Sequence, residues 1–266
     1  MTDSESAGSL QVEASTTVSL GMVRHGEPVP GVLACVYREA SAGLDARCLA
    51  LLHPNEQQRL EELRAESRRL GYFLGRHAAK LAVRTLGGVV PMRAVEIASG
   101  VFEQPIVKGA LGDAPVVSLS HTRSVAVAVA CEPEHILGVD VEQLDPQRTD
   151  VFESVMPPRE LTMARRAPGG GVQAVNLIWA MKEALSKALR CGLTTPFEVL
   201  ESESFEPHGD GGWSCLFHNF AQYQARAWVL GHHVLAVVSP KHSIVRIAPE
   251  DLERVRQVLE RDASRS

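Results

Sequence analysis

A weak repeat in residue spacing most constrains how this 266-residue chain can fold. After an interval of 105 positions, Gly87, Pro91 and Glu96 recur as Gly192, Pro196 and Glu201. In each half, a long amphipathic segment ends at the glycine, and short apolar runs typical of strands lie around or beyond the glutamate. Gly and Pro are common after helices, so the shared order of elements matters more than the three identities. We therefore predict an α+β fold with a pseudo-two-fold duplication of two similar halves and a ligand groove between them.

The other patterns divide the chain into four parts. Residues 1–18 are acidic, rich in Ser and Thr and without an apolar signal-peptide core, so they are predicted to be a disordered tail. Residues 19–134 form the N-terminal α+β half, 135–248 the C-terminal half, and 249–266 a terminal helix with a polar end. Predicted helices cover residues 55–69, 70–86, 158–164 and 172–190, and predicted strands cover 31–36, 116–119, 125–130, 136–142, 228–230 and 234–238.

Composition excludes several classes of protein. A net charge of −5 argues against extended nucleic-acid binding, so a polyanionic ligand requires a local basic patch. Apolar residues make up 45 % of the chain, yet no stretch approaches the roughly 20 apolar residues of a membrane span. The five cysteines are scattered and form no C-x-x-C pair, which argues against zinc and predicts a reducing, cytoplasmic location.

The segment 172–190 carries the densest group of chemically useful residues. At 100° per residue its apolar stripe comprises Ile178, Met181, Leu185 and Leu189. Trp179, Glu183 and Lys187 are each one turn apart and share a neighbouring face. Taken separately, Glu183 could be a surface acid paired with Lys187, worth about 0.3–0.5 kcal/mol, and Trp179 a packing residue. Beside the acidic strand 138–142, these separate explanations become less economical.

A second group lies in Gly138-Val139-Asp140-Val141-Glu142. Strand periodicity directs Asp140 and Glu142 to one side, whereas the flanking residues are apolar. Solvated acids at a strand end would explain them, but acids within a buried strand need a partner or a metal. Together with Glu183 they form an oxygen ligand set that suits Mg²⁺.

Two further features suggest contacts with phosphate. Arg76 and Lys80 lie four residues apart on one side of a predicted helix, with Arg59 on the helix before it. They form either a solvated cationic face or a phosphate clamp. Ser120 and His121 lie in a predicted turn, where they could be surface residues or phosphate donors. A Ser-His nucleophile is less well supported because no G-x-S-x-G elbow is present, and no Walker or Rossmann loop is present either.

At these residues the chain resembles the 4′-phosphopantetheinyl transferases of the surfactin-synthetase-activating type, over residues 52–240. The turn Ser118-Leu119-Ser120-His121-Thr122 resembles the family's N-[IL]-S-H-[ST], with Ser118 where Asn is common. The strand GVDVE is similar to G-[IV]-D-[IV]-E, and the helix WAMKEALSK to W-x-x-K-E-[AS]-x-x-K. The last two motifs in this order are highly specific together.

The resemblance implies a monomer of two pseudo-symmetric halves with coenzyme A at their junction. It implies a Mg²⁺-dependent transfer of the phosphopantetheine arm to a serine of an apo acyl or peptidyl carrier protein, with release of 3′,5′-ADP. Such carriers often belong to polyketide or nonribosomal peptide synthases. Carried over by motif, the implied metal ligands are Asp140, Glu142 and Glu183, the implied base is Glu183, and the implied contacts to coenzyme A are Arg59, Arg76, Lys80, Ser120, His121, Trp179 and Lys187.

The chain departs from the family pattern at two places. Glu103-Gln104-Pro105 stands where Gly-Lys-Pro is frequent, and Glu56 stands where some members have a lysine. Coenzyme A is then expected to depend more on Arg59, Arg76 and Lys80. The alternative functions are a metal-dependent phosphodiester hydrolase and a non-enzymatic coenzyme A-binding module. Residues 144–171 are the expected docking region for the carrier.

Overall fold

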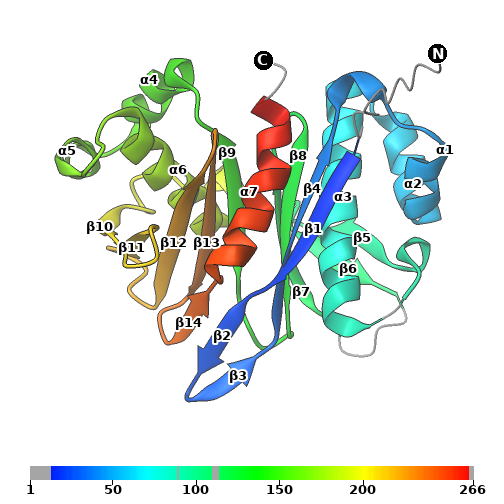
Figure 1. Cartoon of the computed structure of the whole chain (residues 1–266), viewed down its shortest axis with the longest axis horizontal. Helices are drawn as coiled ribbons and strands as arrows, with labels where there is room; N and C mark the ends of the chain where they lie inside the picture. The colour runs from blue at the N-terminus through cyan, green and yellow to red at the C-terminus, as the bar shows by residue number, and fades with distance from the viewer. Residues whose placement is uncertain (1–12, 89, 110–113, 264–266) are drawn as a thin grey trace, which may run out of the picture.

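The structure, a computed structural model, describes residues 13–88, 90–109 and 114–263. Two antiparallel sheets form its centre (Figure 1). In spatial order, the first comprises β1 (Glu13–Ser19), β4 (Gly31–Arg38), β8 (Val125–Cys131) and β7 (Val116–His121). The second comprises β10 (Ser202–Pro207), β11 (Trp213–Phe217), β12 (Tyr223–Leu230), β13 (His233–Pro240) and β9 (Gly138–Gln143). With helices packed on these sheets, the fold has the predicted α+β class.

One long helix packs on each sheet. Helix α3 (Glu66–Gly87) contacts β4, β7 and β8, and α6 (Val172–Ala188) contacts β9, β12 and β13. Their apolar residues follow the helical period, so one side of each helix is buried, as Leu74, Leu177 and Leu185 show. These two contacts place the ends of α3 and α6 beside the junction of the sheets.

A third helix, α7 (Pro249–Ala263), covers the opposite side of the junction. It contacts β1, β4 and β12, and Figure 1 shows it in red, running between the two sheets. In β4, Cys35 belongs to the core under α7, whereas its neighbour Ala34 belongs to the core under α3, as strand alternation requires. Val139 of β9 and Val255 of α7 lie in the same core as Cys35, so both halves bury one common interior.

The remaining elements are short. They are α1 (Ala46–Leu51), α2 (Pro54–Glu62), α4 (Pro146–Val155), α5 (Pro158–Arg166), the pair β5 (Glu96–Ser99) and β6 (Pro105–Lys108), the sheet of β14 (Ser243–Arg246), β2 (Gly21–Arg24) and β3 (Glu27–Val29), and 3-10 turns at Ala40–Ala42, Met92–Ala94 and Gly192–Thr194. All five cysteines are free. Within the described ranges, no helix combines the length and apolar character needed to cross a membrane.

The two halves place their elements in the same order. Helices α1 and α2, the long helix α3, the pair β5 and β6 and the hairpin β7–β8 correspond to α4 and α5, α6, β10 and β11, and β12–β13. The sheets agree as well, because β4, β8 and β7 are neighbours in that order, as are β9, β13 and β12. This arrangement is compatible with the predicted duplication.

A buried ion pair joins the elements of the N-terminal half. Lys80 of α3, 1 % exposed, pairs with Glu56 in the first turn of α2 and also donates to the carbonyl of Leu51 at 3.0 Å. The second oxygen of Glu56 accepts the backbone N–H of Ile97 in β5 at 2.8 Å. Lys80 and Glu56 therefore connect α3, α2 and β5, and the buried charges are satisfied by each other and by the backbone.

The C-terminal half contains the same construction. Lys182 of α6 donates to Glu160 in the first turn of α5 at 2.7 Å, and both side chains are fully buried. The other oxygen of Glu160 accepts the backbone N–H of Ser202 in β10 at 2.7 Å. Neither pair is expected from the sequence, because lysine and glutamate are rarely placed in a core by residue type alone.

Several predicted boundaries are wrong, and the reasons lie in tertiary contacts. Residues 13–18 of the predicted tail belong to β1, which pairs with β4 along its whole length. The rest of the tail, residues 1–12, lies outside the described residues. The helix predicted over 55–69 ends at Glu62 without a Gly or Pro. The carbonyl of Leu60 accepts the N–H of the C-cap Leu63 and also the guanidinium of Arg69 in α3, the latter at 2.7 Å.

Two further differences affect the site. Ser120 and His121 end strand β7 and do not lie in the turn that follows it. The connection after β9 holds two helices, α4 and α5, where only one was predicted. The missed helix starts with Asp145 as its N-cap and Pro146 as its first residue, a recognisable signal for a helix start.

Candidate functional site

Strand β9 places two carboxylates at the junction of the halves. Val139 and Val141 point into the common core, so Asp140 and Glu142 share the other side of the strand, as predicted. Serines of β7 connect the sheets here: Ser120 Oγ donates to Asp140 Oδ1 at 2.7 Å, and Ser118 Oγ accepts Val139 N–H at 3.1 Å. Asp140 is therefore held from the N-terminal half although it belongs to the C-terminal sheet.

Helix α6 brings a lysine and a third carboxylate to the same place. It lies so close to β9 that a Cβ on Gly138 would be 1.9 Å from the carbonyl oxygen of Ala184. Lys187 Nζ donates to Asp140 Oδ1 at 2.6 Å. Burial, together with the negative charge of Asp140, raises the pKa of Glu183 to about 7, and Lys187 offsets only part of this effect. The structure thus brings Asp140 of β9 together with Glu183 and Lys187 of α6, which are distant from it in the sequence.

Glu142 is held by two donors. The indole N–H of Trp179 donates to Oε1 at 3.2 Å, and Arg148 of α4 donates to Oε2 at 2.9 Å. Burial and the charge of Asp140 nevertheless raise the pKa of Glu142. The ring of Trp179 is stacked between Phe152 and Phe197, with centroid distances of 4.1 and 4.5 Å.

The donor set fits a hard divalent cation. Asp140 Oδ2 is buried and has no hydrogen-bond partner, and the pKa values of Glu142 and Glu183 are raised first by burial and then by repulsion from Asp140. A divalent cation would satisfy the free oxygen and relieve this repulsion. Among the described residues, no three His, Cys, Asp or Glu side chains are already gathered into a metal-ligating cluster. Asp140 and Glu142 are instead neutralised by Lys187 and Arg148.

A cavity of about 190 Å³ adjoins this group at the junction. Its wall combines apolar residues of β7 and of the segment before β9 with Arg76 and Lys187. Gln104, where the resemblance led us to expect a lysine, also lines it. The cavity is therefore largely apolar, with Arg76 from the N-terminal half and Lys187 and Arg190 from the C-terminal half.

A second cavity, of about 320 Å³, lies on the N-terminal half and shares Arg76 with the first. Arg59 and Lys108 also line it, together with Glu96 and with Glu56, which is paired with Lys80. The cations exceed the remaining acid, which favours a phosphate ligand here. Arg76 lies with its guanidinium carbon 3.7 Å from the ring centre of Tyr72. Arg59 is exposed and donates to Glu62 at 2.5 Å.

Four predicted residues have different surroundings from those expected. Lys80 is buried against Glu56 and lines neither cavity, so it is unsuited to hold a phosphate. Both ring faces of Trp179 are covered, so it can hold Glu142 but cannot stack on a ligand. Ser120 is committed to Asp140, whereas the ring of His121 lies against Gly71 of α3.

Two residues near the candidate site, Arg148 and Lys108, were not predicted from the sequence. Arg148 follows the Asp-Pro start of α4, and that helix signal could have placed it one turn beyond the end of β9. Lys108 ends β6 and gives no signal of its own, because only the pairing of β5 with β6 brings it beside the second cavity.

Residues 136–238 match the family model of the 4′-phosphopantetheinyl transferase superfamily. The matched segment runs from just before β9 into β13 and contains Asp140, Glu142, Trp179, Glu183 and Lys187. It covers less than half of the 266-residue chain. No curated protein matches the chain.

Proposed function

We propose that this protein transfers the 4′-phosphopantetheine arm of coenzyme A to a serine of an apo acyl or peptidyl carrier protein and releases 3′,5′-ADP. The observation that carries the proposal is the group of Asp140, Glu142 and Glu183 with Lys187 beside a cavity, within the segment that matches the superfamily model. The motifs around these residues favour the surfactin-synthetase-activating type.

Coenzyme A is proposed to occupy the two cavities that meet at Arg76. The cavity lined by Arg59, Arg76 and Lys108 supplies positive charge for the 3′-phosphate end. His121 lines neither cavity, so a contact with the ribose end rests on its motif alone. The cavity lined by Lys187 takes the part of the molecule near the pyrophosphate. Lys80 has no place in this arrangement, because a buried lysine paired with Glu56 cannot reach a ligand.

Asp140, Glu142 and Glu183 would hold the Mg²⁺ ion. When bound, this ion supplies positive charge that stabilises the pyrophosphate as its bond is broken. Lys187 adds a second positive charge there, since its ammonium group is partly exposed and already positioned by Asp140. Ser120 keeps Asp140 oriented through its hydrogen bond.

Glu183 is proposed to accept the proton of the carrier serine. The serine oxygen forms a bond to the phosphorus that bears the pantetheine arm, the bond from this phosphorus to the 3′,5′-ADP oxygen breaks, and the hydroxyl proton moves to the Glu183 carboxylate. In the metal-free protein, burial and the charges of Asp140 and Glu142 raise the pKa of Glu183, and a bound Mg²⁺ would lower it again. The assignment of Glu183 as base therefore rests on its place in the motif and on its position beside Asp140 and Lys187.

The direct test incubates the protein with Mg²⁺, coenzyme A and a panel of apo carrier proteins, followed by intact-mass spectrometry. Transfer adds one phosphopantetheine arm to the carrier and yields 3′,5′-ADP. A metal-dependent hydrolase would instead release free phosphopantetheine without a carrier. A coenzyme A-binding module would bind the ligand and form neither product.

The carrier is proposed to dock on α4 and α5. Helix α4 reaches the carboxylates through the contact of Arg148 with Glu142, and α5 follows it and packs on α6. Helix α4 also exposes Val151 and Val155, whose surfaces are 62 % and 40 % accessible. We propose a monomeric enzyme, because one chain supplies both halves of the site. We also propose a cytoplasmic location, because free cysteines are typical of a reducing compartment. Carriers of polyketide or nonribosomal peptide synthases are the first to include in the panel.

A further inference from the structure

The two carboxylates of β9 are paired with cations from two different helices. Lys187 of α6 donates to Asp140 at 2.6 Å, and Arg148 of α4 donates to Glu142 at 2.9 Å. Lys187 belongs to the motif that the chain shares with its family, but Arg148 belongs to no such motif. The two cations also differ in exposure, since the side chain of Arg148 is 48 % exposed and that of Lys187 is 26 % exposed.

Glu142 carries a neutral donor on one oxygen and a charged donor on the other. Each carboxylate oxygen can accept more than one contact, so the indole N–H of Trp179 leaves room for a divalent cation. Arg148 has the opposite effect, because its positive charge repels a divalent cation bound to the same carboxylate. The Glu142 side chain is only 15 % exposed, so water screens this repulsion incompletely.

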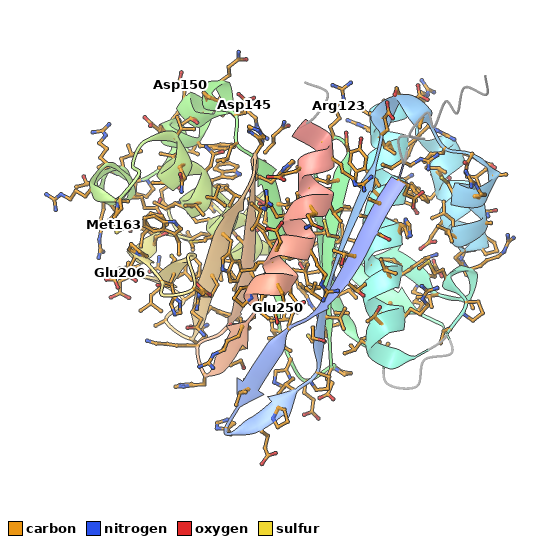
Figure 2. All side chains as sticks on the ribbon, in the orientation of Figure 1. Arg123, Asp145, Asp150, Met163, Glu206 and Glu250 are labelled. Atoms are coloured by element: carbon orange, nitrogen blue, oxygen red, sulfur yellow. The ribbon has the colours of Figure 1, made fainter. Side chains whose placement is uncertain are left out.

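The backbone of α4 holds Arg148 in place beside Glu142. Figure 2 shows Asp145 where β9 passes into α4, and its carboxylate caps the helix by accepting Gln147 N–H at 2.8 Å. One turn on, the hydroxyl of Thr149 accepts a buried hydrogen bond of 3.2 Å from Asn176 of α6. The helix is thus anchored on both sides of Arg148, and only the side chain of Arg148 is free to leave Glu142.

We infer that Arg148 competes with the divalent cation for Glu142 and thereby sets the metal affinity of the site. This inference rests on the proposed function, since it takes Asp140, Glu142 and Glu183 as the metal ligands. In the metal-free protein Arg148 neutralises Glu142, and binding of the cation displaces the guanidinium toward solvent. The Arg148 side chain is half-exposed, so water can solvate its guanidinium once it leaves Glu142.

The test is a binding titration with Mn²⁺ alone, in which free Mn²⁺ is measured by electron paramagnetic resonance without coenzyme A or carrier. Arg148→Gln is expected to bind Mn²⁺ about tenfold more tightly than the parent, and Arg148→Lys within about twofold of it, because lysine keeps the charge. Arg159→Gln is the matched control: Arg159 lies on the next helix and donates to the backbone carbonyl of Glu203, so its loss should leave the affinity unchanged.

Asp140→Asn separates the inference from the proposed function. If Asp140→Asn weakens Mn²⁺ binding and Arg148→Gln does not strengthen it, the inference is wrong and the metal site stands. If Asp140→Asn leaves Mn²⁺ binding intact, the metal site of the proposed function is wrong and the inference falls with it. Tighter binding by both Arg148→Gln and Arg159→Gln would indicate a general charge effect and would also overturn the inference.

Discussion

The two halves of this protein share a scaffold but not their chemistry. Each joins a long helix, a short helix and a strand through a buried lysine and glutamate, Lys80 with Glu56 and Lys182 with Glu160. The residue after the lysine is Leu81 in the first half and Glu183 in the second. Strand β4 is buried at every residue and has no acid, whereas its counterpart β9 carries two. The shared features are those that hold the fold together, and the reactive groups lie in one half only.

The N-terminal half contributes what the other lacks. It supplies Arg59, Arg76 and Lys108 around the second cavity, and Ser120, which orients Asp140. Each half alone would therefore be incomplete as the proposed site.

The largest effect is expected at Glu183. Glu183→Gln should lower the rate of carrier modification on the order of 10⁴-fold, because the amide can neither accept the serine proton nor bind the metal as a carboxylate. Coenzyme A binding, measured by calorimetry, should change little. If the folded Glu183→Gln protein kept full activity, Glu183 would have no role in the reaction. It would then no longer distinguish the C-terminal half from the N-terminal half.

The buried pairs should have equal effects on stability. Lys80→Met and Lys182→Met are each expected to lower the free energy of unfolding by about 3–5 kcal/mol, because Glu56 or Glu160 is left buried without a counter-charge. Urea titration measures both. Combining Lys80→Met with Glu56→Leu should restore part of the lost free energy of unfolding. If Lys80→Met and Lys182→Met caused very different losses, the two buried pairs would not be equivalent.

The loss of stability caused by adding a methyl group at a close contact between helix and strand should differ between the halves. In Gly138→Ala the new Cβ would meet the backbone oxygen of Ala184 at 1.9 Å, so the helix must move, at a cost of about 1–3 kcal/mol. In Gly71→Ala it would meet the end of the His121 ring at 2.6 Å, which can rotate away. The higher helix propensity of alanine, about 1 kcal/mol, offsets that smaller strain. Thermal unfolding should show a clear loss only for Gly138→Ala.

The smallest effect concerns pH. Burial and the nearby cations lower the pKa of His77 from 6.5 to about 4, and these cations are Arg84, Lys80 and Arg38. Glu13 lies 3.3 Å from Nδ1 of His77, but this nitrogen has no hydrogen-bond partner and the cations prevail. As the pH falls, His77 is therefore protonated at a higher pH in the unfolded chain than in the folded protein.

The free energy of unfolding should consequently decrease between pH 6.5 and 4 by about 1–3 kcal/mol and show no further contribution from His77 below pH 4. The counterpart of His77, three residues before the buried lysine, is Trp179, which does not titrate. His77→Gln should flatten this part of the pH profile in urea titrations. An unchanged profile would show that His77 is not the residue responsible.

Much of the fold could be predicted from local patterns in the sequence. The periods of the apolar residues indicated the long helices and the β7–β8 hairpin, and the same periods placed Asp140 with Glu142 and Glu183 with Lys187. Such patterns depend on residues within one element, so they are visible without the rest of the molecule.

The ends of helices and strands were harder to predict where tertiary contacts determine them. The end of α2 at Glu62 has no breaking residue, and β1 forms because the edge of β4 is available to pair with it. The segment 144–171 was expected to hold one helix, although the Asp-Pro pair at its start signals the second.

The sequence alone determined which side chains share a face, because helical and strand periods follow from backbone geometry. Only the tertiary structure decided which charges meet. It buried Lys80 against Glu56, placed Arg148 on Glu142 and Lys187 on Asp140, and covered both faces of Trp179. It also raised the pKa of Glu183 to about 7. The physical reason is that the energy of a charge depends on its burial and on neighbours from other elements, and these are established only when the sheets and helices pack.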